Sequence, residues 1–236
     1  MYFWQHHLRG EWTGVFTDAS SGSLSLRVPA GGAADPQAAA RREHLVNALD
    51  GGPVQFMTQV HGTTVVWVDE LGAPPVQEQP VADGLLTSDR AAAVLVADCL
   101  PILWVAETAE GRGLAAAVHA GRKGVAANIV RETAQALRAR GGVELEAWIG
   151  PSICGACYEV PEELRAEVAS AVPETFAQTS WGTPSLDLRA GAQAQLEAEG
   201  VRVHRLDVCT LEDRRFFSHR GGSAGRFAGI VYRSGS

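Results

Sequence analysis

Residues 92–106 read AAVLVADCLPILWVA, two apolar runs with a short polar break between them. Both runs, residues 92–97 and 102–106, are apolar at every position, and residues 113–119 nearly repeat the pattern. Strands that are buried on both faces have continuous apolar sequences of this kind. The sequence therefore predicts central strands inside a layered fold.

Segments with a helical period lie between these runs. Residues 123–140 carry apolar side chains on one face and end before Gly141 and Gly142, which predicts an amphipathic helix. The other expected elements are a β-rich run at residues 56–68, strands at 145–149, 201–206 and 228–232, and helices at 161–171 and 186–199. Together they predict an α/β fold, a sandwich of mixed β-sheets flanked by helices, with residues 1–236 as a single domain.

The composition narrows the class of partner. A chain of 236 residues that is 46% hydrophobic can bury a large core. Its formal net charge of -7 disfavours a nucleic acid or an anionic membrane as a general partner, and we expect a small-molecule substrate. The first nine residues lack the features of a signal peptide, which predicts a cytoplasmic protein.

Three residues with metal-binding side chains stand where an apolar run meets Gly, Pro or Asp: His61, Cys99 and His119. Two imidazoles and a thiolate can hold zinc with one coordination position open, where the ion activates water or polarises an oxygen. Each residue alone also suits a hydrogen-bonded histidine or a small buried thiol, and the spacing is not that of a zinc finger.

The remaining cysteines are Cys154, Cys157 and Cys209, too few for a disulfide scaffold in a chain of this length. Cys154 and Cys157 have the spacing of a redox motif but lack the flanking residues of thioredoxins. A redox role, a second metal site and ordinary packing of small residues all remain open for this pair.

Several short motifs follow one another in the order seen in one family. They are QVHG (59–62), ADGLLT (82–87), VADCLPIL (96–103), AVHAG (117–121), IGPSI (149–153), CYEV (157–160), LDL (186–188), CT (209–210), FFSHR (216–220) and GR (225–226). From about residue 55 to its end, the chain resembles the laccase-domain family, once called multicopper polyphenol oxidases and also described as purine nucleoside phosphorylases.

The resemblance implies a single-domain α/β sandwich and one catalytic zinc per chain, held by His61, Cys99 and His119. It implies phosphorolysis of adenosine, inosine and S-methyl-5'-thioadenosine, with adenosine deamination as a further activity. Some members are linked instead to editing of peptidoglycan precursors. Copper chemistry is not expected, because multicopper oxidation needs many histidine ligands and this chain has seven histidines, two of them at its N-terminus.

These reactions need further groups beside the metal. Deamination requires a proton carrier, for which Asp98 and Glu159 are the candidates. Asp98 precedes Cys99 directly, so it equally suits a residue that orients this ligand.

Phosphorolysis requires an anion site. Residues 121–124 begin the expected helix and offer backbone amides, a helix dipole and the cations Arg122 and Lys123, with a solvated turn as the alternative. Arg220 is a further candidate for substrate binding. At the two positions that Arg122 and Lys123 occupy here, the family commonly has Trp followed by Arg. Without the Trp ring, aromatic stacking is lost, and this difference bears on substrate preference.

Two other classes of function fit the same residues. A metal-free cysteine hydrolase would use Cys99 as nucleophile and His119 as base. A metabolite-binding protein without catalysis would use zinc only to shape its pocket, with residues 111–124 as the recognition surface.

Overall fold

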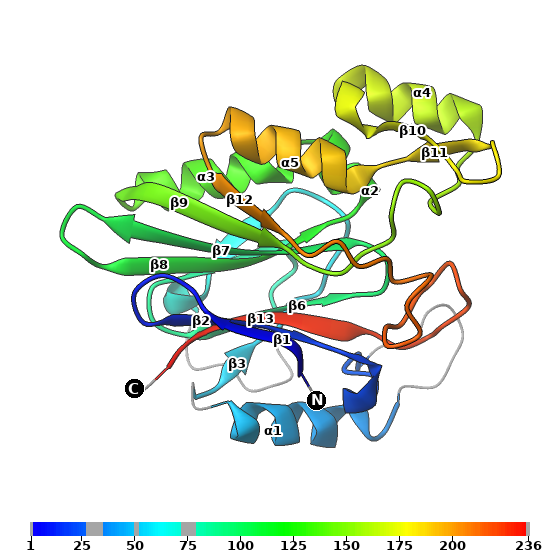
Figure 1. The fold of residues 1–236 in the computed structure, drawn as a ribbon. Coiled ribbons are helices and arrows are strands. Elements are labelled where there is room, and N and C mark those ends of the chain that lie inside the picture. Colours follow the sequence, from blue (N-terminus) through cyan, green and yellow to red (C-terminus); the bar gives the residue numbers. More distant parts are fainter. Residues whose placement is uncertain (1, 27–34, 50–51, 72–78, 235–236) are drawn as a thin grey trace.

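Two β-sheets lie face to face, and helices cover the outer side of each (Figure 1). The computed structural model describes residues 2–26, 35–49, 52–71 and 79–234. The expected α/β sandwich with mixed sheets is confirmed. Within those ranges, every helix is too short or too polar to cross a membrane.

The first sheet has five strands in the order β1-β2-β13-β6-β3. All its neighbours are antiparallel except β3 and β6. Helix α1 covers its outer face, where Leu45 packs with Val15, Ala93 and Ile230. The bounds are β1 (Tyr2–His7), β2 (Trp12–Thr17), β13 (Phe227–Arg233), β6 (Ala91–Val96), β3 (Val54–Gln55) and α1 (Ala38–Ala48).

The second sheet has six strands in the order β12-β9-β7-β8-β5-β4, with parallel pairs at its two edges. Its strands are β12 (Arg202–Arg205), β9 (Gly142–Ile149), β7 (Leu100–Thr108), β8 (Gly113–Ala120), β5 (Gly84–Thr87) and β4 (Val65–Trp67). The helices on its outer side are α2 (Arg122–Ala126), α3 (Ile129–Ala139) and α5 (Leu188–Ala198). The remaining elements are α4 (Glu162–Ala171), the hairpin β10 (Phe176–Gln178) and β11 (Pro184–Leu186), and the 3-10 helices Ala19–Ser21, Val68–Glu70 and Pro173–Thr175.

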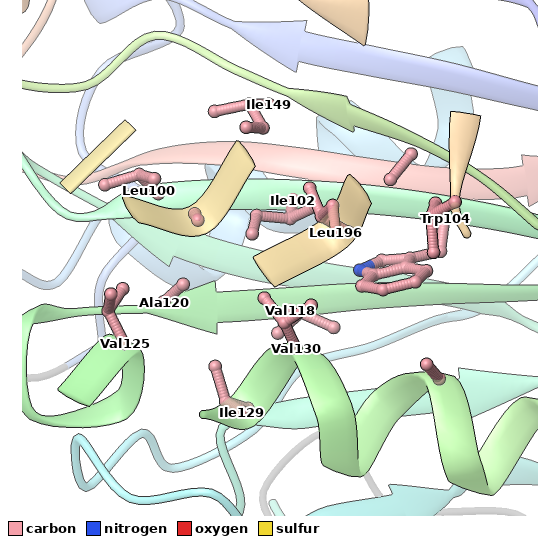
Figure 2. Packing of buried hydrophobic residues seen from close by; sticks show 14 of the residues in the cluster. Leu100, Ile102, Trp104, Val118, Ala120, Val125, Ile129, Val130, Ile149 and Leu196 are labelled. Atoms are coloured by element: carbon pink, nitrogen blue, oxygen red, sulfur yellow. The ribbon is translucent and has the colours of Figure 1, made fainter. Parts of the chain in front are cut away.

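Alternate side chains of β7 fill two different cores. Ile102 and Trp104 point toward the helices (Figure 2), whereas Leu103 and Val105 pack between the two sheets. Strand β8 alternates in the same way. This double burial explains the continuous apolar sequences of the central strands, which are confirmed as β6, β7 and β8.

The site depends on this alternation. Ala115 and Ala117 of β8 face the space between the sheets, so His119, two residues further on, points to the same side at the end of the strand. Cys99 packs against the same core between the sheets. The ends of the central strands therefore present both side chains at one end of the inter-sheet layer.

The single helix expected over residues 123–140 is wrong, because α2 and α3 are separate helices. Asn128 lies between them with a φ of 61°, in the left-handed region, where a helix cannot continue. Its side chain accepts a hydrogen bond from Arg131 N at 3.0 Å and so caps the start of α3.

The β-rich run at residues 56–68 is also not one strand. Only β3 just before it and β4 near its end are strands, with one isolated bridge at Thr58 between them. The backbone amides of His61 and Gly62 donate to the side chain of Asp83, not to a neighbouring strand. The other expected strands and helices coincide with β9, β12, β13, α4 and α5, apart from small shifts at their ends.

Candidate metal centre and its cavity

Two loops and the end of one strand bring His61, Cys99 and His119 together at one end of the sandwich. His61 lies in the loop between β3 and β4, Cys99 lies between β6 and β7, and His119 is near the end of β8. Their metal-binding atoms all lie within 4.8 Å of one another. His61 Nε2 is 4.0 Å from Cys99 Sγ, and the two imidazole rings meet edge to face with centroids 4.7 Å apart. This trio could hold a metal ion.

One buried carboxylate, Asp83, organises both histidines. Asp83 Oδ1 lies 2.8 Å from His119 Nδ1 and accepts from His61 N at 2.9 Å, while Oδ2 accepts from Gly62 N at 2.7 Å. Burial opposes ionisation of Asp83, but the hydrogen bonds from His119 and the Gly62 amide outweigh it and lower its pKa. Because an ionised carboxylate only accepts, His119 Nδ1 carries the proton, which leaves Nε2 for a metal.

Asp83 belongs to the ADGLLT motif but is not among the site residues that the sequence predicts. The one sequence feature that marks it is a charged residue at the start of an apolar strand. Its partners lie 21 to 36 residues away along the chain, so only the fold identifies them.

The turn that carries Cys99 is held by Asp98, whose φ is 87°. The Asp98 carboxylate accepts from Thr210 Oγ1 and from Arg220 N, each at 2.7 Å. Both oxygens are thereby engaged, an arrangement that favours orientation of the Cys99 turn over proton transfer. His61 also has a left-handed backbone, with a φ of 61°, so two unusual conformations flank the trio.

Charge within the trio favours metal binding. Burial alone would raise the pKa of the Cys99 thiol, but attraction to His119 and hydrogen bonds from both imidazoles lower it to about 6. Burial also opposes protonation of His119, yet the Cys99 charge and the Asp83 hydrogen bond raise its pKa to about 9. Without metal, the two groups form a thiolate and imidazolium pair at neutral pH. The thiolate is the form that binds metal, and a metal ion would take the place of the proton on His119 Nε2.

Gly121 leaves room for the three side chains of the trio. A Cβ atom at this position would lie 2.9 Å from His61 Cδ2 and 3.3 Å from both Cys99 Sγ and His119 Cε1. Its φ of -79° is open to any residue, so space around the trio, not backbone conformation, requires glycine. Two nitrogens and one sulfur in this cradle fit zinc with an open coordination position.

A cavity of about 750 Å³ adjoins the trio, and His61, Cys99 and His119 all line it. Two arginines, Arg42 and Arg226, line the same cavity. The Arg42 guanidinium is 3.8 Å from the Phe56 ring centroid, Nε donates to Leu24 O, and burial lowers its pKa to about 10.

Arg226 also belongs to this wall. Burial lowers its pKa, while the negative charges of Cys99 and Asp98 act in the opposite direction. His219 and Gln59 add polar groups to the lining. Arg42 is not among the site residues that the sequence predicts, because it lies on α1, the helix that covers the five-stranded sheet, far from the trio in the sequence. The cavity therefore has the charge to hold an anion beside a metal-capable trio.

The other predicted substrate residues gather around Tyr158. Arg220 Nη1 donates to Glu159 O at 2.8 Å, and its guanidinium lies 5.3 Å from the Tyr158 ring centroid. Burial and the Cys99 charge raise the pKa of Tyr158, while Arg122 and Arg220 oppose them. Glu159 Oε2 accepts from Trp181 Nε1 at 3.0 Å.

Lys123 is exposed on α2, a helix of only five residues. Residues 121–124 therefore do not begin a long helix, and the helix dipole expected there is much reduced. The roles predicted for Arg122 and Lys123 in substrate binding remain predictions.

Another cluster could also hold a metal ion. It comprises Cys154, Cys157, Cys209 and Glu212, whose ligand atoms lie within 4.8 Å of one another. All four cysteines of the chain are free thiols in the structure.

Known proteins share this sequence and fold. The family described as multi-copper polyphenol oxidoreductase laccase matches residues 13–234. A Streptomyces griseus protein named purine nucleoside phosphorylase is 45% identical over 233 residues, which span 94% of this chain and 91% of that protein. A protein of the same name from Streptomyces coelicolor is 44% identical over 208 residues, 84% of each chain. The crystal structure of YlmD from Geobacillus stearothermophilus has a TM-score of 0.82 at 25% identity, with both chains fully covered. The resemblance inferred from the motifs is confirmed, and the chain belongs to the multi-copper polyphenol oxidoreductase laccase family.

Proposed function

We propose that the protein is a zinc-dependent purine nucleoside phosphorylase that acts on adenosine, inosine and S-methyl-5'-thioadenosine with phosphate. The observation that carries the proposal is the His61, Cys99 and His119 trio on a cavity that also contains guanidinium groups. Such a cavity suits a neutral nucleoside together with an anionic co-substrate. Two relatives that bear the name purine nucleoside phosphorylase, at 44% and 45% identity, support it.

His61, Cys99 and His119 would hold the zinc ion, and the hydrogen bond that His119 Nδ1 donates to Asp83 would fix the tautomer of His119. When bound, zinc supplies a Lewis acid beside the substrate. The ligand types argue against multicopper oxidation. Among the described residues, the two metal-capable groups contain two imidazoles in all, fewer than several copper ions need.

Phosphorolysis joins a phosphate oxygen to C1' of the ribose while the bond from C1' to purine N9 breaks. The purine leaves with the electron pair of that bond and gains a proton. Arg226 would hold the phosphate, with the charge of Arg42 in support. His219 lines the same cavity, and its imidazole would be the group that gives the purine its proton.

The proposal includes adenosine deamination as a second activity, in which water replaces the amino group at C6 and ammonia leaves. The product separates the two reactions. Deamination converts adenosine to inosine without phosphate, whereas phosphorolysis gives adenine and ribose 1-phosphate only when phosphate is present.

The test is a chromatographic assay of the zinc-loaded protein with each nucleoside, with and without phosphate. We expect phosphate-dependent hypoxanthine from inosine, and its loss in His61→Ala. His7→Ala is the matched control, because His7 is exposed on β1. Product formation that is equal in wild type and His61→Ala would reject the proposed role of the trio, and no product from any nucleoside would reject the substrate class.

A cysteine hydrolase is the second candidate, and the chain of contacts from Cys99 through His119 to Asp83 favours it. Nucleophile, base and orienting carboxylate are arranged in this way in cysteine enzymes. Removal of metal distinguishes the two candidates. The hydrolase would keep its activity after chelation and would be alkylated at Cys99 by a substrate-like electrophile, whereas the phosphorylase would lose its activity.

A further inference from the structure

The cluster of three cysteines and Glu212 has no part in the chemistry above. Three sulfur atoms and one carboxylate oxygen, from Cys154, Cys157, Cys209 and Glu212, lie within 4.8 Å of one another. Cys157 and Cys209 are buried, Cys154 is half-buried, and Glu212 is exposed. The cluster is therefore shielded from solvent on the sulfur side and open on the side of the carboxylate.

Two backbone turns build this cluster. In the first, the amides of Cys157 and Tyr158 both donate to Cys154 O, at 3.0 and 2.9 Å, so the two thiols project to one side. In the second, Asp213 N donates to Cys209 O at 2.9 Å, and this turn carries Glu212 back beside Cys209. Each turn thus contributes two of the four ligand atoms.

Backbone pairing fixes the two turns against each other. Ser152 forms an isolated bridge with Cys209, through Ser152 N to Val208 O at 3.2 Å and Thr210 N to Ser152 O at 3.0 Å. The amide of Cys154 donates to Cys209 Sγ at 3.4 Å. This hydrogen bond ties the first turn to the sulfur atom of the second.

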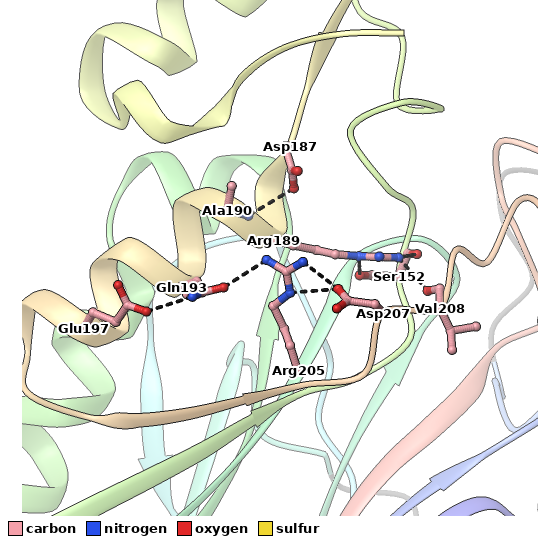
Figure 3. Close-up of polar contacts among 9 residues, drawn as sticks. All are labelled: Ser152, Asp187, Arg189, Ala190, Gln193, Glu197, Arg205, Asp207 and Val208. Atoms are coloured by element: carbon pink, nitrogen blue, oxygen red, sulfur yellow. Dashed lines mark hydrogen bonds and ion pairs between the residues drawn. The ribbon is translucent and has the colours of Figure 1, made fainter. Parts of the chain in front are cut away.

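A buried cation lies behind the same pairing. Arg189 of α5 donates through Nε to Ser152 Oγ at 2.8 Å, and its Nη2 reaches the carbonyl oxygens of Ser152 and Val208 (Figure 3). A divalent ion with three thiolates and a carboxylate carries excess negative charge. Arg189 offers the fixed positive charge that such a group requires in a buried setting.

We propose that Cys154, Cys157, Cys209 and Glu212 form a second zinc site, closed by four protein ligands and structural in role. Three thiolates with one carboxylate suit this borderline-soft ion, and a complete set of four ligands leaves no position for a substrate. The site would join the turn at residues 154–158 to the turn at residues 209–213.

This join would support the candidate metal centre indirectly. Thr210, next to Cys209, donates to Asp98 Oδ1, and Tyr158, next to Cys157, lies under Arg220. The second site is independent of the proposed phosphorylase activity, because its ligands are separate from the trio.

The experiment uses the full chain with Cys99→Ala, which removes the sulfur atom of the trio and leaves three thiols. Zinc content and thiol reactivity toward a disulfide reagent are measured before and after a chelator is added. We expect one zinc per chain, with three thiols that are protected until the chelator removes the ion. Replacement of zinc by cobalt should give thiolate-to-cobalt charge-transfer absorption in the same variant.

Glu212→Gln tests the fourth ligand without disturbing the buried part of the cluster, and Glu163→Gln on α4 is the exposed control. Glu212→Gln should release zinc to the chelator faster than Glu163→Gln, which should match the parent. Absence of zinc in the reduced Cys99→Ala protein, thiols that react equally with and without zinc, or a disulfide between two of these cysteines in the freshly purified chain would each overturn the proposal.

Discussion

At Asp83, one carboxylate serves two parts of the candidate metal centre. It orients the His119 ring and also accepts the amides of the loop that carries His61. Gly121 contributes by the absence of a side chain, because any Cβ would touch all three members of the trio. At the scale of single residues, the centre thus depends on neighbours that bind no metal themselves.

Asp83→Asn should weaken zinc binding by about 10–100-fold, because the neutral amide cannot replace a charged acceptor behind a ligating histidine. Competition with a chromophoric chelator measures the affinity. Asp89→Asn is the control, since Asp89 is exposed and its partner is Arg233. If both variants bind zinc as tightly as wild type, Asp83 does not support the ligands.

Gly121→Ala should weaken zinc binding because the added methyl group overlaps the ligand side chains. Overpacking of this kind costs about 1–3 kcal/mol. The control is Gly62→Ala, whose methyl group would meet Asp83 Oδ2 at an ordinary 3.5 Å. Both variants are compared by zinc titration, and an equal effect of the two would argue against the steric explanation.

The pH dependence of Cys99 reports the charge pair within the trio. In the chelated protein, alkylation of Cys99 should accelerate as pH rises through about 6 and level off above it, because the thiolate is then fully formed. His119→Gln removes the opposing charge and should move this rise upward. If the wild-type alkylation rate still rises as pH approaches 9.0, the ordinary pKa of a cysteine thiol, the charge pair of Cys99 and His119 is contradicted.

At the scale of elements, the central strands were predictable and the helix break was not. Strands β6, β7 and β8 are buried on both faces, and this condition marks the sequence itself. The break at Asn128 is different. Val125 of α2 and Ile129 of α3 pack into the same core, so the apolar pattern continues across the break. The sequence of α1 has no clear apolar helical period, because one of its three buried residues is Arg42.

Asn128→Ala should destabilise the fold by about 2 kcal/mol, since it removes the cap of α3 and forces alanine into a left-handed conformation. Asn128→Gly loses the cap but tolerates the backbone, and we expect a smaller loss. Urea denaturation gives both values. If the alanine variant is as stable as the glycine variant, the left-handed backbone at residue 128 does not account for the loss of stability.

At the scale of the whole molecule, the fold gathers residues that the sequence leaves far apart. The trio was predictable from short motifs at the ends of apolar runs. The cation Arg42 and the ligand candidate Glu212 were not, because their neighbours come from distant segments and different layers. Long-range packing thus determines the surroundings of the trio, while local sequence motifs identify its members.

The most direct test of the central claim is the rate of phosphate-dependent hypoxanthine release from inosine as zinc is returned to the chelated protein. The account predicts that wild type regains activity as zinc is added and that Cys99→Ala, shown by circular dichroism to be folded, gains none at any zinc concentration. Full activity in the chelated protein before zinc is added, or equal recovery in Cys99→Ala, would contradict it.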